Sequence, residues 1–106
     1  MAVTMSHPEF VDLVDRTQAA ARRVGLWPVG LTFTDEQPPR RHWWSRRHLD
    51  QSRIVVYVAR THRRPDQIVA DLRRAIVRHA SPALTPDQRF TRAAALRRLT
   101  ERETAC

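Results

Sequence analysis

The spacing of hydrophobic residues divides the chain into one helix, a group of short strands and two further helices. Residues 6–24 carry apolar side chains three and four positions apart, as on one face of an amphipathic helix. This face consists of Phe10, Val14, Thr17, Ala21 and Val24. Ser6 and Glu9 have the spacing of a capping box, and Gly25 is a usual helix stop. We therefore predict a first helix over residues 6–24 that can lie on a sheet.

The next segment has the pattern of strands. Leu31 and Phe33 alternate with threonines, which predicts a short half-buried strand, and the prolines of residues 35–39 end it. Residues 40–48 are ambiguous, and one interpretation is a second strand that leads into a turn at residues 49–52. Residues 53–59 read R-I-V-V-Y-V-A and are apolar on both faces, which predicts a covered, central strand.

Two helices complete the predicted fold. Pro65 and Asp66 suit the first turn of a helix that ends near Ala80, before Ser81-Pro82. Thr85, Pro86 and Gln88 have the start signature of a last helix. Its apolar stripe drifts around the axis, so the sequence does not determine what it packs on; the stripe comprises Phe90, Ala93, Ala94, Leu96 and Leu99.

The order of elements predicts the fold class. Strands followed by helices indicate an α+β domain, which we expect to hold a small three-stranded sheet with one preceding and two following helices. A chain of 106 residues with 42% hydrophobic residues is long enough for one modest core, so we predict a single domain over residues 1–106.

Composition narrows the location and the redox chemistry. The sequence has no run of 18 apolar residues and no secretory pattern at its start, so we expect a cytoplasmic protein without a membrane partner. The single cysteine, Cys106, cannot form an internal disulfide or a two-cysteine metal site.

The net charge of +8 favours an acidic partner such as nucleic acid. All 19 basic residues are arginine, and arginine can bind phosphate through two parallel hydrogen bonds. Abundant Ala, Val and Leu without Asn is also the pattern of a GC-rich coding genome. Whether the arginines reflect phosphate binding or codon bias therefore stays open.

One histidine lies on the apolar face of the helix over residues 66–80. Ile68, Leu72, Ala75, Ile76 and His79 fall within about 100° of one another around the axis, whereas Asp71, Arg73, Arg74 and Arg78 fall on the remaining surface. A lone histidine in this position is typical of the edge of a core, where its ring nitrogens bind a carbonyl or water.

Three stretches together resemble a known family. They are S-R-R-H-L-D-Q-S-R-I-V-V-Y-V-A-R, the linker R-R-P-D-Q, and I-V-A-D-L-R-R-A-I-V-R-H-A. In pattern and order they resemble the SprT-like minimal zincin metalloproteases over about residues 8 to 80. In that family a helix and a small sheet precede a helix that carries H-E-x-x-H. Here the five motif positions are Ala75, Ile76, Val77, Arg78 and His79.

The substitutions remove the family's chemistry. H-E-x-x-H needs two imidazoles to hold zinc and a carboxylate to accept a proton, and only His79 remains. The resemblance thus implies a pseudoenzyme, with no catalytic residue, no metal ligand and no cofactor. A composite metal site from His7, His42, His48 and His62 has no support from spacing, although a divergent metal-dependent hydrolase stays open as an alternative.

The richest polar segment is R-R-H-W-W-S-R-R-H over residues 40–48. Arginines interleaved with aromatic residues suit single-stranded or distorted nucleic acid, because arginines follow the backbone while an indole stacks on a base. The alternative is a solvated edge whose tryptophans cover the core, since Trp43 and Trp44 would point to opposite faces of a strand. The candidate contact residues are Arg41, Trp43, Arg46, Arg47, Arg63 and Arg64.

We therefore expect a non-catalytic, zincin-like domain that binds a macromolecule, with nucleic acid ahead of protein. The alternative is a structural or adaptor subunit that binds another protein in a phage, defence or mobile-element assembly, since Arg and Trp also anchor protein interfaces. The sequence leaves the partner's identity and the oligomeric state undetermined.

Overall fold

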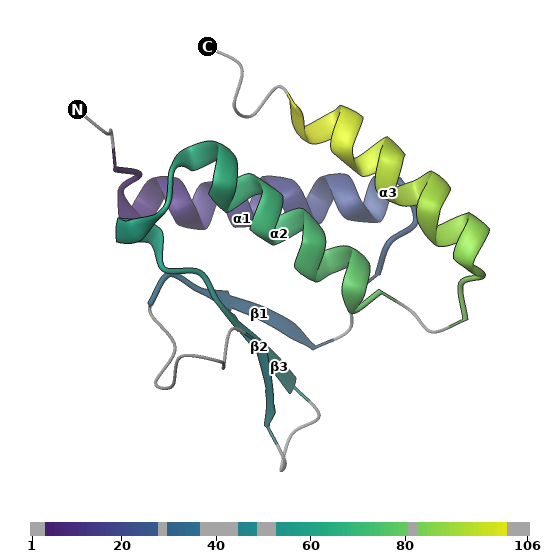
Figure 1. The fold of residues 1–106 in the computed structure, drawn as a ribbon, viewed down its shortest axis with the longest axis horizontal. Coiled ribbons are helices and arrows are strands. Elements are labelled where there is room, and N and C mark those ends of the chain that lie inside the picture. Colours follow the sequence, from purple (N-terminus) through teal and green to yellow (C-terminus); the bar gives the residue numbers. More distant parts are fainter. Residues whose placement is uncertain (1–3, 28–29, 37–44, 49–52, 81–82, 102–106) are drawn as a thin grey trace.

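Helices and strands follow one another in the predicted order (Figure 1). The structure is a computed structural model that describes residues 4–27, 30–36, 45–48, 53–80 and 83–101. The elements are α1 (His7–Arg23), β1 (Leu31–Thr34), β2 (Ser45–His48), β3 (Arg53–Tyr57), a 3₁₀ turn (Arg60–His62), α2 (Pro65–Arg78) and α3 (Pro86–Thr100). The predicted α+β class is confirmed.

The sheet has the strand order β1-β3-β2. β1 lies parallel to β3, with Leu31 opposite Ile54 and Phe33 opposite Val56. β2 runs antiparallel to β3 on the other side, with Ser45 opposite Val56. The predicted central position of β3 is confirmed, although this strand ends at Tyr57 rather than at residue 59, because Ala59 already caps the 3₁₀ turn.

The helices all lie on one side of the sheet (Figure 1). On that side Ile54, Val56 and Val58 are buried, whereas Val55 and Tyr57 alternate with them and are half-buried. The prediction of a strand covered on both faces therefore holds fully for the helix side and only partly for the other.

Local signals determine α1. The Ser6 hydroxyl accepts a hydrogen bond from the Glu9 backbone N–H, and the Ser6 N–H donates to the Glu9 carboxylate, so the predicted capping box is present. After the helix, Gly25 takes a φ of +81°, which favours glycine. The buried face includes Leu13, whereas the predicted Val14 is only half-buried.

α2 forms the centre of the core. It packs on both α1 and α3, and its side chains Ile68, Val69, Leu72 and Ile76 are at most 1% exposed. Fully burying an aliphatic side chain of this size stabilises a fold by about 1.5–3 kcal/mol. α2 therefore contributes a large part of the hydrophobic stabilisation.

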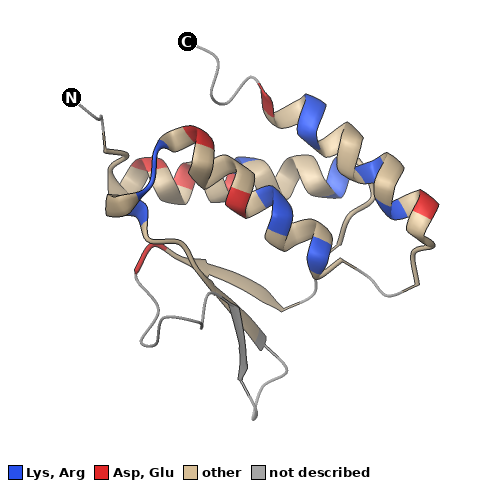
Figure 2. Cartoon of the chain, viewed as in Figure 1, with Lys and Arg blue, Asp and Glu red and all other residues tan. Residues whose placement is uncertain are grey.

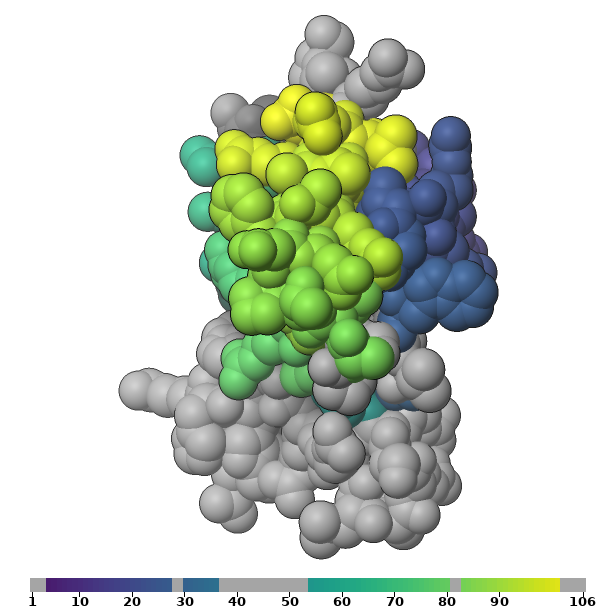
Figure 3. Space-filling model, turned by 90° about the vertical axis from the view of Figure 1, so that its right-hand side faces the viewer, coloured from purple at the N-terminus to yellow at the C-terminus, as the bar shows by residue number. Residues whose placement is uncertain are grey.

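Arginines attach α3 to the rest of the domain. Arg89 Nη1 donates to the Val77 carbonyl at 2.7 Å, and Arg92 Nη1 donates to the Gly25 carbonyl at 2.9 Å. Figure 3 shows α3 against the segment that follows α1. The last helix thus packs on its own domain.

The apolar stripe predicted for α3 is largely wrong. Only its Leu96 is fully buried, while Phe90 is 78% exposed. The buried positions include Thr100, whose hydroxyl donates to the Leu96 carbonyl and accepts from Arg73 Nη1. Burial, with the nearby charge of Arg97, lowers the pKa of Arg73 below its ordinary value.

A half-buried carboxylate connects three distant segments. Asp35 Oδ2 lies 2.6 Å from His7 Nδ1 and 2.9 Å from Arg60 Nε, and Arg60 Nη1 also donates to the Met5 carbonyl. The start of α1, the end of β1 and the 3₁₀ turn therefore meet at Asp35. The hydrogen bond from His7, together with the hydrogen bond and charge of Arg60, holds the pKa of Asp35 below its ordinary value of 3.8, although burial opposes this.

We predict that Asp35→Asn lowers the free energy of unfolding by about 1–3 kcal/mol at neutral pH, because it removes two charge-assisted hydrogen bonds. A lowered native pKa stabilises the fold above the unfolded value, so this difference shrinks as the pH falls below about 4 and disappears below the native pKa. Urea unfolding at several pH values measures it. Asp12→Asn, which breaks an exposed pair with Arg16, is the matched control and should have an effect under about 0.5 kcal/mol. Equal effects of the two variants would contradict the assigned role of Asp35.

Candidate functional site

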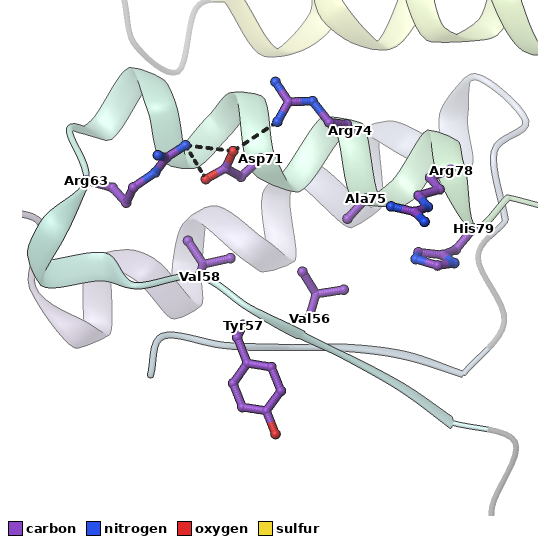
Figure 4. Close-up of a pocket in the computed structure, with 9 residues that line it drawn as sticks. All are labelled: Val56, Tyr57, Val58, Arg63, Asp71, Arg74, Ala75, Arg78 and His79. Atoms are coloured by element: carbon purple, nitrogen blue, oxygen red, sulfur yellow. Dashed lines mark hydrogen bonds and ion pairs between the residues drawn. The ribbon is translucent and has the colours of Figure 1, made fainter. Parts of the chain in front are cut away.

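A pocket of about 450 Å³ lies between α2 and β3 (Figure 4). Among the described residues, α2 and its C-terminal cap supply Asp71, Arg74, Ala75, Arg78 and His79 to its lining. β3 and the residue after it supply Val56, Tyr57 and Val58, and the loop before α2 supplies Arg63. A helix, a strand and a loop thus converge on one cavity.

The floor of the pocket is aliphatic. Val56 and Val58 point from the sheet toward α2, and Ala75 faces them from the helix (Figure 4). The ring of Tyr57 points to the opposite side of the strand, in keeping with the alternation of side chains along β3. The floor therefore offers carbon surface without a polar side chain.

One end of the rim is an ion-pair network. Arg63 Nη2 lies 2.9 and 2.7 Å from the two carboxylate oxygens of Asp71, and Arg74 Nη1 lies 3.4 Å from Oδ1 of the same carboxylate. The Arg63 side chain is 35% exposed, whereas that of Arg74 is 75% exposed. Arg63 is therefore held in place by Asp71, and Arg74 remains largely open to solvent.

Arg78 and His79 form the other end. Both side chains lie beside the aliphatic floor (Figure 4), and Arg78 is exposed. The His79 backbone N–H donates to the Ala75 carbonyl and caps α2, while its side chain is half-buried. Three arginines thus surround the pocket with one aspartate, which makes this cavity electropositive.

Two of the five positions compared with H-E-x-x-H, Ala75 and Ile76, carry aliphatic side chains. Ala75 and His79 line the same pocket, one helical turn apart, but Ala75 carries no ligand atom. Ile76, which the expected zincin-like alignment sets opposite the glutamate, is 0% exposed and lies in the core. Within the described part of the chain, no group of three or more His, Cys, Asp or Glu side chains could hold a metal ion.

The predicted contact residues have different outcomes. Arg41 and Trp43 lie outside the described residues. Arg46 and Arg47 belong to β2, where their backbones pair with Val55 and Ile54, so β2 runs beside the strand that walls the pocket. Arg63 lines the pocket.

Arg64 lies one residue outside this pocket. Its side chain is 68% exposed and pairs with Asp66, and it borders a second hollow together with Arg63 at the start of α2. Of these two predicted contact residues, Arg63 therefore lines the pocket and Arg64 lies next to it.

Arg74 and Arg78 line the pocket but are not among the predicted contact residues, because helical periodicity places them only on the surface that solvent or a partner would meet. Figure 2 shows basic residues along the second half of α2. A signal existed in the spacing: Asp71, Arg74 and Arg78 lie three and four residues apart, so they form one edge of the helix, beside Ala75. The sequence does not show that β3 borders this edge.

Comparison with known protein families, characterised proteins and solved structures finds no match to this chain. No helix within the described ranges is long and apolar enough to cross a membrane. The functional interpretation therefore depends on the geometry of the pocket.

We predict that Arg63→Gln lowers the free energy of unfolding by about 1–2 kcal/mol, because it leaves the half-buried Asp71 carboxylate with only the longer contact to Arg74. Arg64→Gln is the neighbouring control, since its pair with Asp66 is exposed on both sides, and its effect should stay under about 0.5 kcal/mol. Chemical denaturation of both variants measures the difference. A larger loss for Arg64→Gln would show that the ion pair with Asp71 does not position the loop.

Proposed function

We propose that this chain is a non-catalytic domain that binds single-stranded or distorted nucleic acid through an arginine-rich surface around the α2–β3 pocket. The observation that carries the proposal is the convergence of Arg63, Arg74 and Arg78 on one pocket. Guanidinium groups bind phosphate oxygens through two parallel hydrogen bonds, and several of them on one surface give the electrostatic attraction that dominates nucleic-acid affinity.

The neighbouring strand extends this surface. β2 contains Arg46 and Arg47 and pairs antiparallel with β3, whose next residues wall the pocket. Adjacent strands of a sheet lie about 5 Å apart, so a nucleic-acid strand that crosses the pocket beside β3 would also lie close to the backbone of β2. We therefore include β2, which contains the predicted contact residues Arg46 and Arg47, in the proposed surface together with Arg63, Arg74 and Arg78.

Not all of the positive charge is available for a partner. Arg60, Arg89 and Arg92 donate hydrogen bonds inside the fold, and Arg60 is only 20% exposed. Arg74 at 75% exposure and the exposed Arg78 are accessible, so the pocket rim supports the proposed binding better than the net charge does.

We also propose that the fold is zincin-like. The leading helix, the sheet and the helix that follows come in the order expected of a minimal zincin, and the buried Ile76 stands in place of the proton-accepting glutamate. A cytoplasmic protein of this kind would bind a macromolecule without hydrolysing it. The alternative of a divergent metal-dependent hydrolase makes a different prediction about metal content.

We expect elemental analysis of the purified chain to find zinc well below one equivalent, because Ala75 and Ile76 supply no ligand or base beside His79. His79→Ala is the control. One equivalent of zinc that disappears in this variant would support the hydrolase alternative and contradict the pseudoenzyme proposal.

A second candidate function is that of a structural or adaptor subunit. Two aromatic side chains favour it, since Trp27 is 61% exposed and Phe90 is 78% exposed, and aromatic residues anchor protein interfaces. Salt separates the two functions, because phosphate contacts weaken steeply with ionic strength and aromatic contacts do not.

We predict that the quadruple variant Arg46→Gln, Arg47→Gln, Arg74→Gln, Arg78→Gln loses at least about tenfold in affinity for a single strand of about twelve nucleotides. The slope of log K against log salt should also become shallower by about 0.7 for each phosphate that the variant no longer neutralises. Fluorescence anisotropy at several salt concentrations measures both quantities.

The matched control removes the same number of charges elsewhere. Arg22, Arg23, Arg97 and Arg98 are exposed on α1 and α3 and do not line the pocket, so their replacement by Gln should change the affinity much less. Equal losses in the two quadruple variants would show that net charge alone drives binding and would contradict this site.

A further inference from the structure

The pocket has two chemically distinct parts. Its floor is carbon from Val56, Val58 and Ala75, while its rim is guanidinium from three arginines. A bare phosphate would contact the rim alone and not the floor. The complementary ligand therefore has an apolar face and an anionic group.

The two ends of the rim differ in charge. At one end Asp71 accepts from both Arg63 and Arg74, so the positive charge there is partly compensated. At the other end Arg78 has no carboxylate partner within the described residues, and His79 lies beside it. An anionic group is thus favoured at the Arg78 end, with Asp71 disfavouring the opposite placement.

The size of the cavity limits the occupant. A volume of about 450 Å³ lies within the range of pockets that enclose a small ligand, roughly 300–1,000 Å³, and is open to solvent along the arginine rim. A flat ring with a phosphate attached meets these requirements of shape and charge. A duplex does not, because its bases are stacked and paired and cannot reach the floor.

We infer that the α2–β3 pocket takes one nucleotide of the bound single strand, with the base against Val56, Val58 and Ala75 and its phosphate on Arg78. This inference rests on the proposed function and adds that the base itself is bound. Arg74 lies on the same helix edge one turn before Arg78, so it can hold a neighbouring phosphate of the strand. The domain would then prefer single strands to duplexes.

A substitution that adds an apolar side chain at the floor of the pocket tests the inference without changing any charge. Ala75→Met in the full chain should weaken binding to a fluorescent thymidine strand of about twelve nucleotides by about fivefold to tenfold, because the added side chain occupies the place of the base. An abasic strand of the same length keeps the phosphates and lacks the bases, so its weaker binding should not change. Ala94→Met, at an exposed position of α3, is the control and should alter neither affinity.

The outcomes separate this inference from the proposed function. Unchanged affinity of Ala75→Met for the thymidine strand, or an equal loss on both strands, overturns the nucleotide pocket and leaves arginine-driven binding in place. Absence of binding to either strand by the unaltered chain overturns the proposed function itself, as does selective binding of an acidic peptide.

A measurement on the unaltered chain covers the case in which Ala75→Met does not fold. Thymidine 5′-monophosphate added to the protein should give nuclear Overhauser contacts between the base and the methyl groups of Val56, Val58 and Ala75. Inorganic phosphate should compete at Arg78. Nucleotide contacts confined to other methyl groups, or none at saturating nucleotide, would overturn the assignment.

Discussion

The burial of α2 is the constraint on which the rest of the structure depends. Its aliphatic face fills the space between the sheet, α1 and α3, so Ile68, Leu72 and Ile76 are fully buried. Because that face points into the core, the orientation of α2 about its own axis places Asp71, Arg74 and Arg78 along the edge beside β3. One helix therefore supplies both the hydrophobic core and the charged rim of the pocket, and neither can shift without the other.

The arginines of this chain have two roles, and the degree of burial distinguishes them: some donate hydrogen bonds inside the fold, and others lie exposed at the pocket rim. Arg60 and Arg92 reach across the fold to carbonyl and carboxylate groups that would otherwise lose hydrogen bonds on burial. Arg74 and Arg78 extend into solvent at a cavity whose floor is apolar. A high net charge thus overstates the surface that a nucleic acid could use, and the position of each guanidinium decides its role.

Local signals made most of the fold predictable. Two capping boxes, at Ser6 and Thr85, determined where α1 and α3 begin, and an uninterrupted apolar run determined the central strand. The packing of α3 was not predictable, because Arg92 binds a carbonyl 67 residues earlier in the chain. The candidate site was predictable only in part for the same reason: Arg63, a predicted contact residue, lines the pocket, whereas Arg74 and Arg78 line it only because β3 approaches this edge of α2.

The central claim is that the α2–β3 pocket, rather than the whole basic surface, is where this chain meets a nucleic-acid strand. Mapping backbone amide shifts by nuclear magnetic resonance, while a short single strand is added, tests it most directly. We predict that the largest changes in amide shift fall on residues 53–58 and 71–79 and saturate together. Changes confined to α1 and α3, or spread evenly over the exposed arginines, would contradict it.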